Sequence, residues 1–199
     1  MKKTVSLLSV LLLLFAATVA VAADVKKAPA AAPAAAPAPV AKPAPPKAPT
    51  YDTYVFPEVK LGSSLPAMPL RTLKGEEKDL ISLAKPGVAM VVFFTNSTCS
   101  ACRGEAALLA SLKADLKGKF NLVGVLTDIS DKGYTSLDKE VQESAEFLHD
   151  PSFKVPPAFG FEYTPALIIV KDGKLKASKG GFNPAHDGQT VTELILNNI

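Results

Sequence analysis

The pattern of apolar and polar residues divides the chain into a leader, a Pro-rich segment and one folded domain. Behind Lys2 and Lys3, an almost unbroken apolar run covers residues 5–23 and ends in the small residues Ala20-Val21-Ala22. A basic start, an apolar stretch and a small-residue exit are typical of a secretory signal peptide. We therefore expect residues 1–23 to be a signal peptide. The run approaches the roughly 20 residues that cross a bilayer, so an uncleaved membrane anchor is the alternative.

The next segment, residues 24–50, has a very different composition, since 19 of its 27 residues are Ala or Pro. Such a segment has little to bury, and its prolines lack backbone donors, so it is predicted to be a disordered linker. Residues 51–199 are left as the folded domain.

Strand-like and helix-like patterns alternate within this domain. Residues 88–95 form a continuous apolar run with β-branched and aromatic side chains, which predicts a strand buried on both faces. Residues 100–116 switch to apolar spacings of three and four, which predicts a helix that Gly118 ends. The later patterns predict a strand over 120–126, a helix over 135–148, a strand over 166–170, a hairpin turn at Asp172-Gly173, a strand over 175–178 and a helix over 190–198.

Before this alternating part, residues 56–83 contain short apolar stretches separated by Pro and polar residues, with a turn at Lys74-Gly75. This pattern favours short strands, and we expect an N-terminal β extension. The order of the later elements predicts an α/β fold whose sheet ends in an antiparallel hairpin.

The net charge of +3 does not describe the domain. Residues 51–199 hold 16 Lys and Arg against 18 Asp and Glu, and the other six cations lie in the leader and linker. A near-neutral domain lacks the basic surface that nucleic-acid binding requires, so no nucleic acid is expected as a partner.

The two cysteines of the chain, Cys99 and Cys102, lie between the predicted strand over 88–95 and the body of the next helix. A Cys-x-x-Cys pair at such a junction can exchange a disulfide with another protein. Cys99 falls at the helix start, where unpaired N–H groups and the helix dipole stabilise a thiolate. Cys102 lies one turn deeper. Cys99 is therefore predicted to attack the substrate and Cys102 to resolve the mixed disulfide.

Other uses of the pair are less consistent with the sequence. A structural disulfide that closes so short a loop stabilises less than one that closes a long loop. A metal site needs more ligands, and His149 and His186 are not at ligand spacing, so no metal is expected. Covalent haem attachment needs a His after the second Cys, where Arg103 stands, and no other cofactor is indicated.

Three stretches of the domain form a recognisable set: the strand Val91-Val92-Phe93-Phe94-Thr95, the Cys99-to-Cys102 motif with Arg103 and Glu105 after it, and Tyr163-Thr164-Pro165 before the strand over 166–170. With them the chain resembles the thioredoxin superfamily, and within it the extracytoplasmic TlpA/ResA-type thiol–disulfide oxidoreductases. The resemblance covers about residues 56–199 and implies a thioredoxin-like fold, with a central mixed β-sheet flanked by helices and an N-terminal β extension.

This resemblance implies roles for three further residues. Pro165 would be a cis-proline facing the disulfide, and the backbone of Thr164 would pair with the substrate chain like an added strand. Glu105 shares a helical face with Cys102 and would act as a third catalytic residue that relays a proton. An ordinary trans-proline and a solvent-facing glutamate are the respective alternatives.

Two departures from the family pattern concern the surroundings of the pair. Thr98 precedes Cys99 where many relatives carry Trp, and Phe93 occupies the strand position where thioredoxin keeps a buried acid. Both affect the expected redox potential and the choice of partner.

The resemblance implies a periplasmic or otherwise extracytoplasmic enzyme that reduces disulfides in exported proteins, for example in apocytochrome c. Because that compartment favours oxidation, a membrane electron donor would recharge it. Contact with the membrane is expected only if the leader is retained. A disulfide oxidase, a thiol peroxidase and a non-enzymatic metallochaperone-like binding domain are the alternatives.

Overall fold

The computed structural model describes residues 50–199. The predicted signal peptide, residues 1–23, and nearly all of the predicted linker, residues 24–50, lie outside the described residues. In the part of the chain that is described, no helix combines the length and the apolar character needed to span a bilayer.

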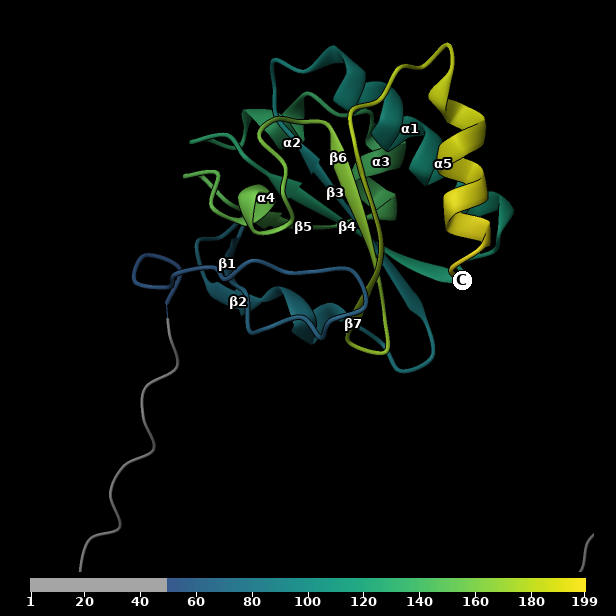
Figure 1. The fold of residues 1–199 in the computed structure, drawn as a ribbon. Coiled ribbons are helices and arrows are strands. Elements are labelled where there is room, and N and C mark those ends of the chain that lie inside the picture. Colours follow the sequence, from purple (N-terminus) through teal and green to yellow (C-terminus); the bar gives the residue numbers. More distant parts are fainter. Residues whose placement is uncertain (1–49) are drawn as a thin grey trace, which may run out of the picture. The chain divides into compact units, whose positions relative to one another are not determined.

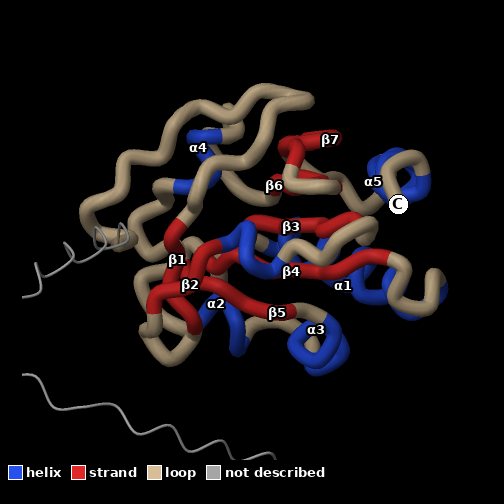
Figure 2. Tube along the Cα trace, turned by 90° about the horizontal axis from the view of Figure 1, so that it is seen from below, coloured by secondary structure: helices blue, strands red, loops and turns tan. Residues whose placement is uncertain are grey.

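A seven-stranded mixed sheet forms the centre of the domain, in the order β2-β1-β5-β4-β3-β6-β7 (Figures 1 and 2). The central strand β3 pairs with β4 in parallel and with β6 in antiparallel fashion, and β6 and β7 form the predicted hairpin. The strands are β1 (Pro69–Thr72), β2 (Glu77–Asp79), β3 (Ala89–Thr95), β4 (Phe120–Leu126), β5 (Glu146–His149), β6 (Ala166–Lys171) and β7 (Lys174–Gly180). The helices are η1 (Leu80–Leu83), α1 (Ser100–Asp115), α2 (Lys132–Thr135), α3 (Lys139–Ser144), α4 (Val155–Ala158) and α5 (Asp187–Leu196).

Strand β3 separates two apolar cores, and all seven of its residues are buried. Phe93 packs into a core with α1, α3 and α5 on one face of the sheet, while Phe94 packs into a second core with the N-terminal extension and α4 on the other. Successive side chains of a strand point to opposite faces. The run is apolar throughout because both faces are covered.

Helix α1 begins and ends close to the predicted positions. Ala106, Leu109 and Ala110 are buried against the sheet, as the apolar spacing indicates. Gly118, with φ of 71°, ends the helical stretch, and its N–H donates to the carbonyl of Lys113 at 2.9 Å. The residue directly after the C-cap is Lys117, with φ of 51°, and this left-handed residue turns the chain so that the N–H of Gly118 satisfies a free carbonyl.

The predicted helix over 135–148 is wrong. Helix α3 ends at Ser144, and the chain then enters the sheet as β5 between β4 and β1. Phe147 faces the core with the long helices, whereas Leu148 faces the other core, so Leu148 and Val141 do not share a helical face. Four residues were too few to reveal a strand by alternation, and backbone pairing with two neighbouring strands decides the conformation.

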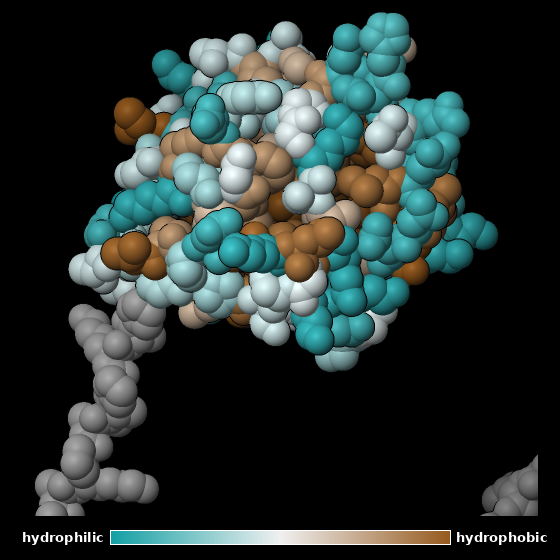
Figure 3. All heavy atoms as spheres, in the orientation of Figure 1, coloured by the Kyte–Doolittle hydropathy of each residue, from teal (hydrophilic) through white to brown (hydrophobic). Residues whose placement is uncertain are grey.

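The N-terminal extension is confirmed as β structure that continues the sheet. Strands β1 and β2 form a hairpin whose turn contains Gly75 with φ of 83°, and β1 then pairs with β5. The surface seen in Figure 3 is mostly hydrophilic, with apolar residues exposed in separate small areas. The large apolar residues with the most exposed surface are Val55, Leu61, Leu73, Ile129, Tyr163 and Leu196.

Candidate active site

The two cysteines lie at the N-terminus of α1 and form a disulfide, with a Cα–Cα distance of 5.2 Å. Cys99 is the N-cap residue, and its sulfur accepts a hydrogen bond from the N–H of Cys102 at 3.0 Å. Cys99 is partly exposed, whereas Cys102 is only 1% exposed. The sulfur of Cys99 is therefore accessible to another protein, whereas that of Cys102 is not.

The loop that carries Cys99 is held in place by a carboxylate that lies just after the end of strand β4. Asp128 follows β4 and accepts hydrogen bonds from the N–H and the hydroxyl of Ser97 at 2.9 and 2.7 Å. The backbone carbonyl of Asp128 is hydrogen-bonded in turn to the ring of His149. These contacts tie the cysteine loop to the carboxyl ends of β4 and β5.

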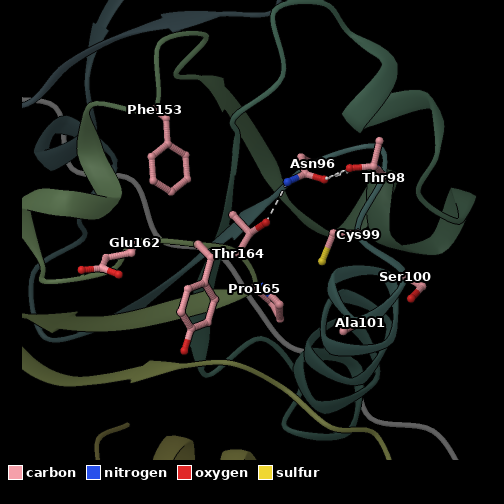
Figure 4. A pocket seen from close by; sticks show the side chains of 10 residues that line it. Asn96, Thr98, Cys99, Ser100, Ala101, Phe153, Glu162, Thr164 and Pro165 are labelled. Atoms are coloured by element: carbon pink, nitrogen blue, oxygen red, sulfur yellow. Dashed lines mark hydrogen bonds between the residues drawn. The ribbon is translucent and has the colours of Figure 1, made fainter.

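Asn96 connects the cysteine loop to the segment before β6. Its side-chain amide donates to the hydroxyl of Thr164 at 2.8 Å, and its carbonyl oxygen accepts from the N–H and the hydroxyl of Thr98 at 3.1 and 2.9 Å (Figure 4). One side chain thus sets the spacing between the two segments that meet at Cys99.

Thr164 and Pro165 lie opposite Cys99, across an open pocket of about 550 Å³. Their peptide bond is cis, as the resemblance implied. Pro165 is buried and Thr164 is partly exposed. Among the described residues, neither the N–H nor the carbonyl of Thr164 takes part in a backbone hydrogen bond.

Glu105 is fully buried one turn beyond Cys102 on α1, and is not the solvent-facing glutamate considered as the alternative. Within residues 50–199, neither oxygen of its carboxyl group has a hydrogen-bond partner. Burial raises the pKa of Glu105 to about 8, against a smaller opposing effect of Lys179. At neutral pH the carboxyl is therefore mostly protonated and can both give and take a proton.

A partly buried ion pair accounts for the charges that act on Glu105. The ammonium of Lys179, on β7, lies 3.5 Å from the carboxylate of Asp187 and donates to the carbonyl of Gly181 at 2.9 Å. The hydrogen bond from the N–H of Asn183 lowers the pKa of Asp187, which keeps this carboxylate ionised. Because the charge of Lys179 is already paired with Asp187, Lys179 only partly offsets the effect of burial on the pKa of Glu105.

Several residues that line the pocket were not found from the sequence. Phe153 reaches it from the loop after β5, and Glu162 and Tyr163 from the loop before β6. Phe153 and Glu162 carry no motif, whereas Tyr163 belongs to the Tyr163-Thr164-Pro165 stretch but was not expected to line a pocket, and only the meeting of distant loops brings the three together. In the part of the chain that the structure describes, no group of three His, Cys, Asp or Glu side chains could hold a metal ion.

No protein-family model and no curated protein matches the sequence. The fold is similar to that of solved structures. One, described as a thiol:disulfide interchange protein DsbE from Chlorobium tepidum, is 22% identical, covers 71% of this chain and 99% of that chain, and has a TM-score of 0.58.

Two further solved structures are similar to the fold to about the same degree. The thioredoxin domain of a thiol-disulfide oxidoreductase from Bacteroides vulgatus is 24% identical, over 69% of this chain and 99% of that one, with a TM-score of 0.54. A secreted Mycobacterium tuberculosis disulfide oxidoreductase, described as homologous to E. coli DsbE, is 20% identical, over 66% and 96%, with a TM-score of 0.54. The mixed sheet flanked by helices agrees with these similarities, and the domain has a thioredoxin-like fold.

Proposed function

We propose that the protein is an extracytoplasmic thiol–disulfide oxidoreductase that exchanges its Cys99–Cys102 pair with disulfides in exported proteins. The observation that carries the proposal is the pairing of an accessible sulfur with a buried one, opposite a backbone segment that is free to pair. The structural neighbours described as thiol–disulfide oxidoreductases support it, as does the leader-like sequence of residues 1–23.

The exchange takes place in two steps. The thiolate of Cys99 attacks one sulfur of the substrate disulfide, a mixed disulfide forms, and the other substrate sulfur leaves as a thiolate that takes up a proton. The thiolate of Cys102 then attacks Cys99, the intramolecular disulfide re-forms, and the second substrate sulfur is released. Two electrons and two protons pass to the substrate.

Thr164 and Glu105 assist in different steps. The free N–H and carbonyl of Thr164 hold the substrate chain as an added strand next to the cis-proline, Pro165. Glu105 takes the proton of Cys102 before the second step in its ionised form, which a pKa of about 8 leaves as a minor form at neutral pH, because water has little access to this sulfur.

We propose further that the pair works as a reductant. A strongly oxidising pair has a stabilised reduced form. Here Cys102 is buried, and burial disfavours the charged thiolate at this sulfur, which works against an oxidant. A reduction potential near −270 mV or lower fits this direction, whereas one near −120 mV would make the protein an oxidase. A reductant in an oxidising compartment also needs a dithiol donor, and a membrane protein is the proposed source.

Trapping the mixed disulfide tests the proposal. The full chain with Cys102→Ala is expressed in its own host and analysed on non-reducing gels, where we expect adducts that disappear on reduction. The matched control carries both Cys99→Ala and Cys102→Ala and should show no adducts. If the single variant forms no adducts, and the reduced wild type does not reduce the disulfides of insulin, the proposed function is wrong.

A further inference from the structure

One wall of the pocket takes no part in the exchange steps. It is formed by Phe153, Glu162 and Tyr163, whereas the cysteine loop and Pro165 form the other side. Among residues 50–199, Glu162 is the one charged residue that lines the pocket. Its side chain is exposed, and among the described residues it forms no salt bridge.

The exposed carboxylate of Glu162 favours a cationic ligand, and the aromatic residues beside it favour a cation as well. Tyr163 is 64% exposed, far more than a tyrosine whose ring packs in a core, and Phe153 is partly exposed in the same pocket. An ammonium or guanidinium group over an aromatic face gains a favourable electrostatic interaction. A carboxylate next to such rings adds a charge-assisted hydrogen bond. Lys and Arg are the side chains that can use both.

Phe153 is held in its position before any substrate arrives. Its backbone has φ of 53°, and its N–H donates to the carbonyl of Asp150 at 3.1 Å. The buried carboxylate of Asp150 accepts from the N–H groups of Lys154 and Val155 at 2.9 and 2.8 Å. A loop fixed on both sides of Phe153 keeps this part of the pocket preformed, which reduces the entropy lost on binding.

The order of residues along the pocket relates this wall to the attacked sulfur. In Figure 4, Thr164 and Pro165 lie between Cys99 on one side and Glu162 and Phe153 on the other. A substrate chain that is attached to Cys99 and runs along Thr164 therefore leads to Glu162. The side chain that meets Glu162 belongs to a residue near the substrate cysteine in sequence.

On the basis of the proposed function, we propose that the preferred substrates are exported protein segments with a Lys or Arg close in sequence to the attacked cysteine. Glu162 binds the cation, with the rings of Phe153 and Tyr163 beside it. Segments with Asp or Glu at the same place are disfavoured, because within residues 50–199 the carboxylate of Glu162 has no paired cation to offset the repulsion.

Two synthetic peptides that differ in charge alone test the proposal. Each contains one cysteine, capped as a disulfide with 2-mercaptoethanol, and has either lysines or glutamates on both sides of it. The second-order rate constant for attack by the reduced full chain is measured at low ionic strength. Each rate is divided by the rate with dithiothreitol, a neutral dithiol, to remove the intrinsic effect of the peptide charge.

We expect the wild type to react about fivefold faster with the lysine peptide, as one favourable ion pair near a surface allows. With Glu162→Gln the ratio of the two normalised rates should fall close to one, and with Glu162→Lys it should invert. The matched control is Glu76→Gln, which removes the same charge from the exposed β1–β2 turn and should keep the wild-type ratio. Because the readout is a ratio within each variant, a general loss of activity does not affect it.

Two outcomes would overturn the inference in different ways. If the wild type attacks both peptides and its ratio equals that of Glu162→Gln, the cation preference is wrong while the exchange activity stands. If the reduced wild type attacks neither peptide nor the disulfide of 2-mercaptoethanol, the proposed function fails, and the inference fails with it.

Discussion

At the scale of single residues, the protonation of Glu105 is set by the surroundings of its side chain. An exposed glutamate at this helix position would titrate near its ordinary pKa. The carboxyl group of Glu105 is fully buried, and the loss of contact with water raises its pKa to about 8. The other buried carboxylate of the domain, that of Asp150, differs because it accepts hydrogen bonds from Tyr51, Lys154 and Val155. The two acids differ because one has donors around it and the other does not.

The raised pKa of Glu105 predicts that stability falls with rising pH. Between the ordinary glutamate pKa of 4.5 and a pH of about 8, the folded protein holds a proton on Glu105 that the unfolded chain releases. The contribution is therefore fully present below 4.5 and is lost as the pH rises through 8, by at most about 1.4 kcal/mol per pH unit. Urea unfolding of the disulfide form from pH 5 to pH 8 measures this slope.

Glu105→Gln is the matched comparison, because it keeps the side-chain volume and cannot ionise. We expect its stability to depend less on pH and to exceed that of the wild type at pH 8. Equal slopes for the two proteins would show that the carboxyl group of Glu105 titrates like an exposed one.

At the scale of elements, the close packing of β4 and β5 requires a residue without a side chain. A Cβ atom on Gly124 would lie 2.4 Å from the ring of Phe147 and 2.9 Å from the ring of Phe93. These two rings pack edge to face with their centroids 6.1 Å apart. The glycine in the middle of the strand is explained by this ring pair rather than by a turn.

Gly124→Ala is therefore expected to lower the free energy of unfolding by about 1–3 kcal/mol, because the added methyl group forces the rings apart. Gly188→Ala is the control, since this glycine lies in the first turn of α5 and, within residues 50–199, no atom beyond its chain neighbours and its own helix backbone lies within 4 Å of the added Cβ. It should raise the stability by about 0.5–1 kcal/mol through its helix propensity. Denaturant unfolding of the two variants measures both effects, and a loss in both would contradict the packing explanation.

At the scale of the whole domain, its first residues hold a loop that is about a hundred positions away in the sequence. The hydroxyl of Tyr51 donates to Asp150 at 2.5 Å and accepts from the N–H of Ser152 at 2.9 Å. Burial raises the pKa of Tyr51 to about 12, so the hydroxyl keeps its proton. Lys154 and Arg71 lie over the ring at 4.7 and 5.3 Å from its centroid. The start of the domain thus supports the loop that carries Phe153 to the pocket.

Tyr51→Phe is expected to lower the free energy of unfolding by about 1–3 kcal/mol, because the buried carboxylate of Asp150 loses a donor. Tyr54→Phe is the control. The ring of Tyr54 packs edge-on against Phe56, and its hydroxyl has no hydrogen bond within residues 50–199, so its loss should have little effect. Thermal or urea unfolding checks both variants, and equal stability of Tyr51→Phe and wild type would contradict the role of this hydroxyl.

Much of the domain's secondary structure could be predicted because the patterns are long. The run over 88–95 and the helical spacing over 100–116 each contain enough apolar residues to distinguish a strand from a helix, and β3 and α1 follow them closely. Short elements gave no such signal. The four residues of β5 were taken into a helix because Leu148 happens to follow Val141 at a helical interval, although the two side chains face opposite cores.

The family resemblance implied the proline that faces the pair, while the sequence by itself determined the position of the two cysteines at a strand-to-helix junction and the order of the long elements. These properties are local, since they depend on spacing and on the conformations that each residue favours. Only the tertiary structure decided that Glu105 is buried without a partner, that Asn96 joins the cysteine loop to Thr164, and that Phe153 and Glu162 share a wall of the pocket. These residues come from loops and helices far apart in the chain, and burial and charge at each depend on which segments the folded sheet brings together.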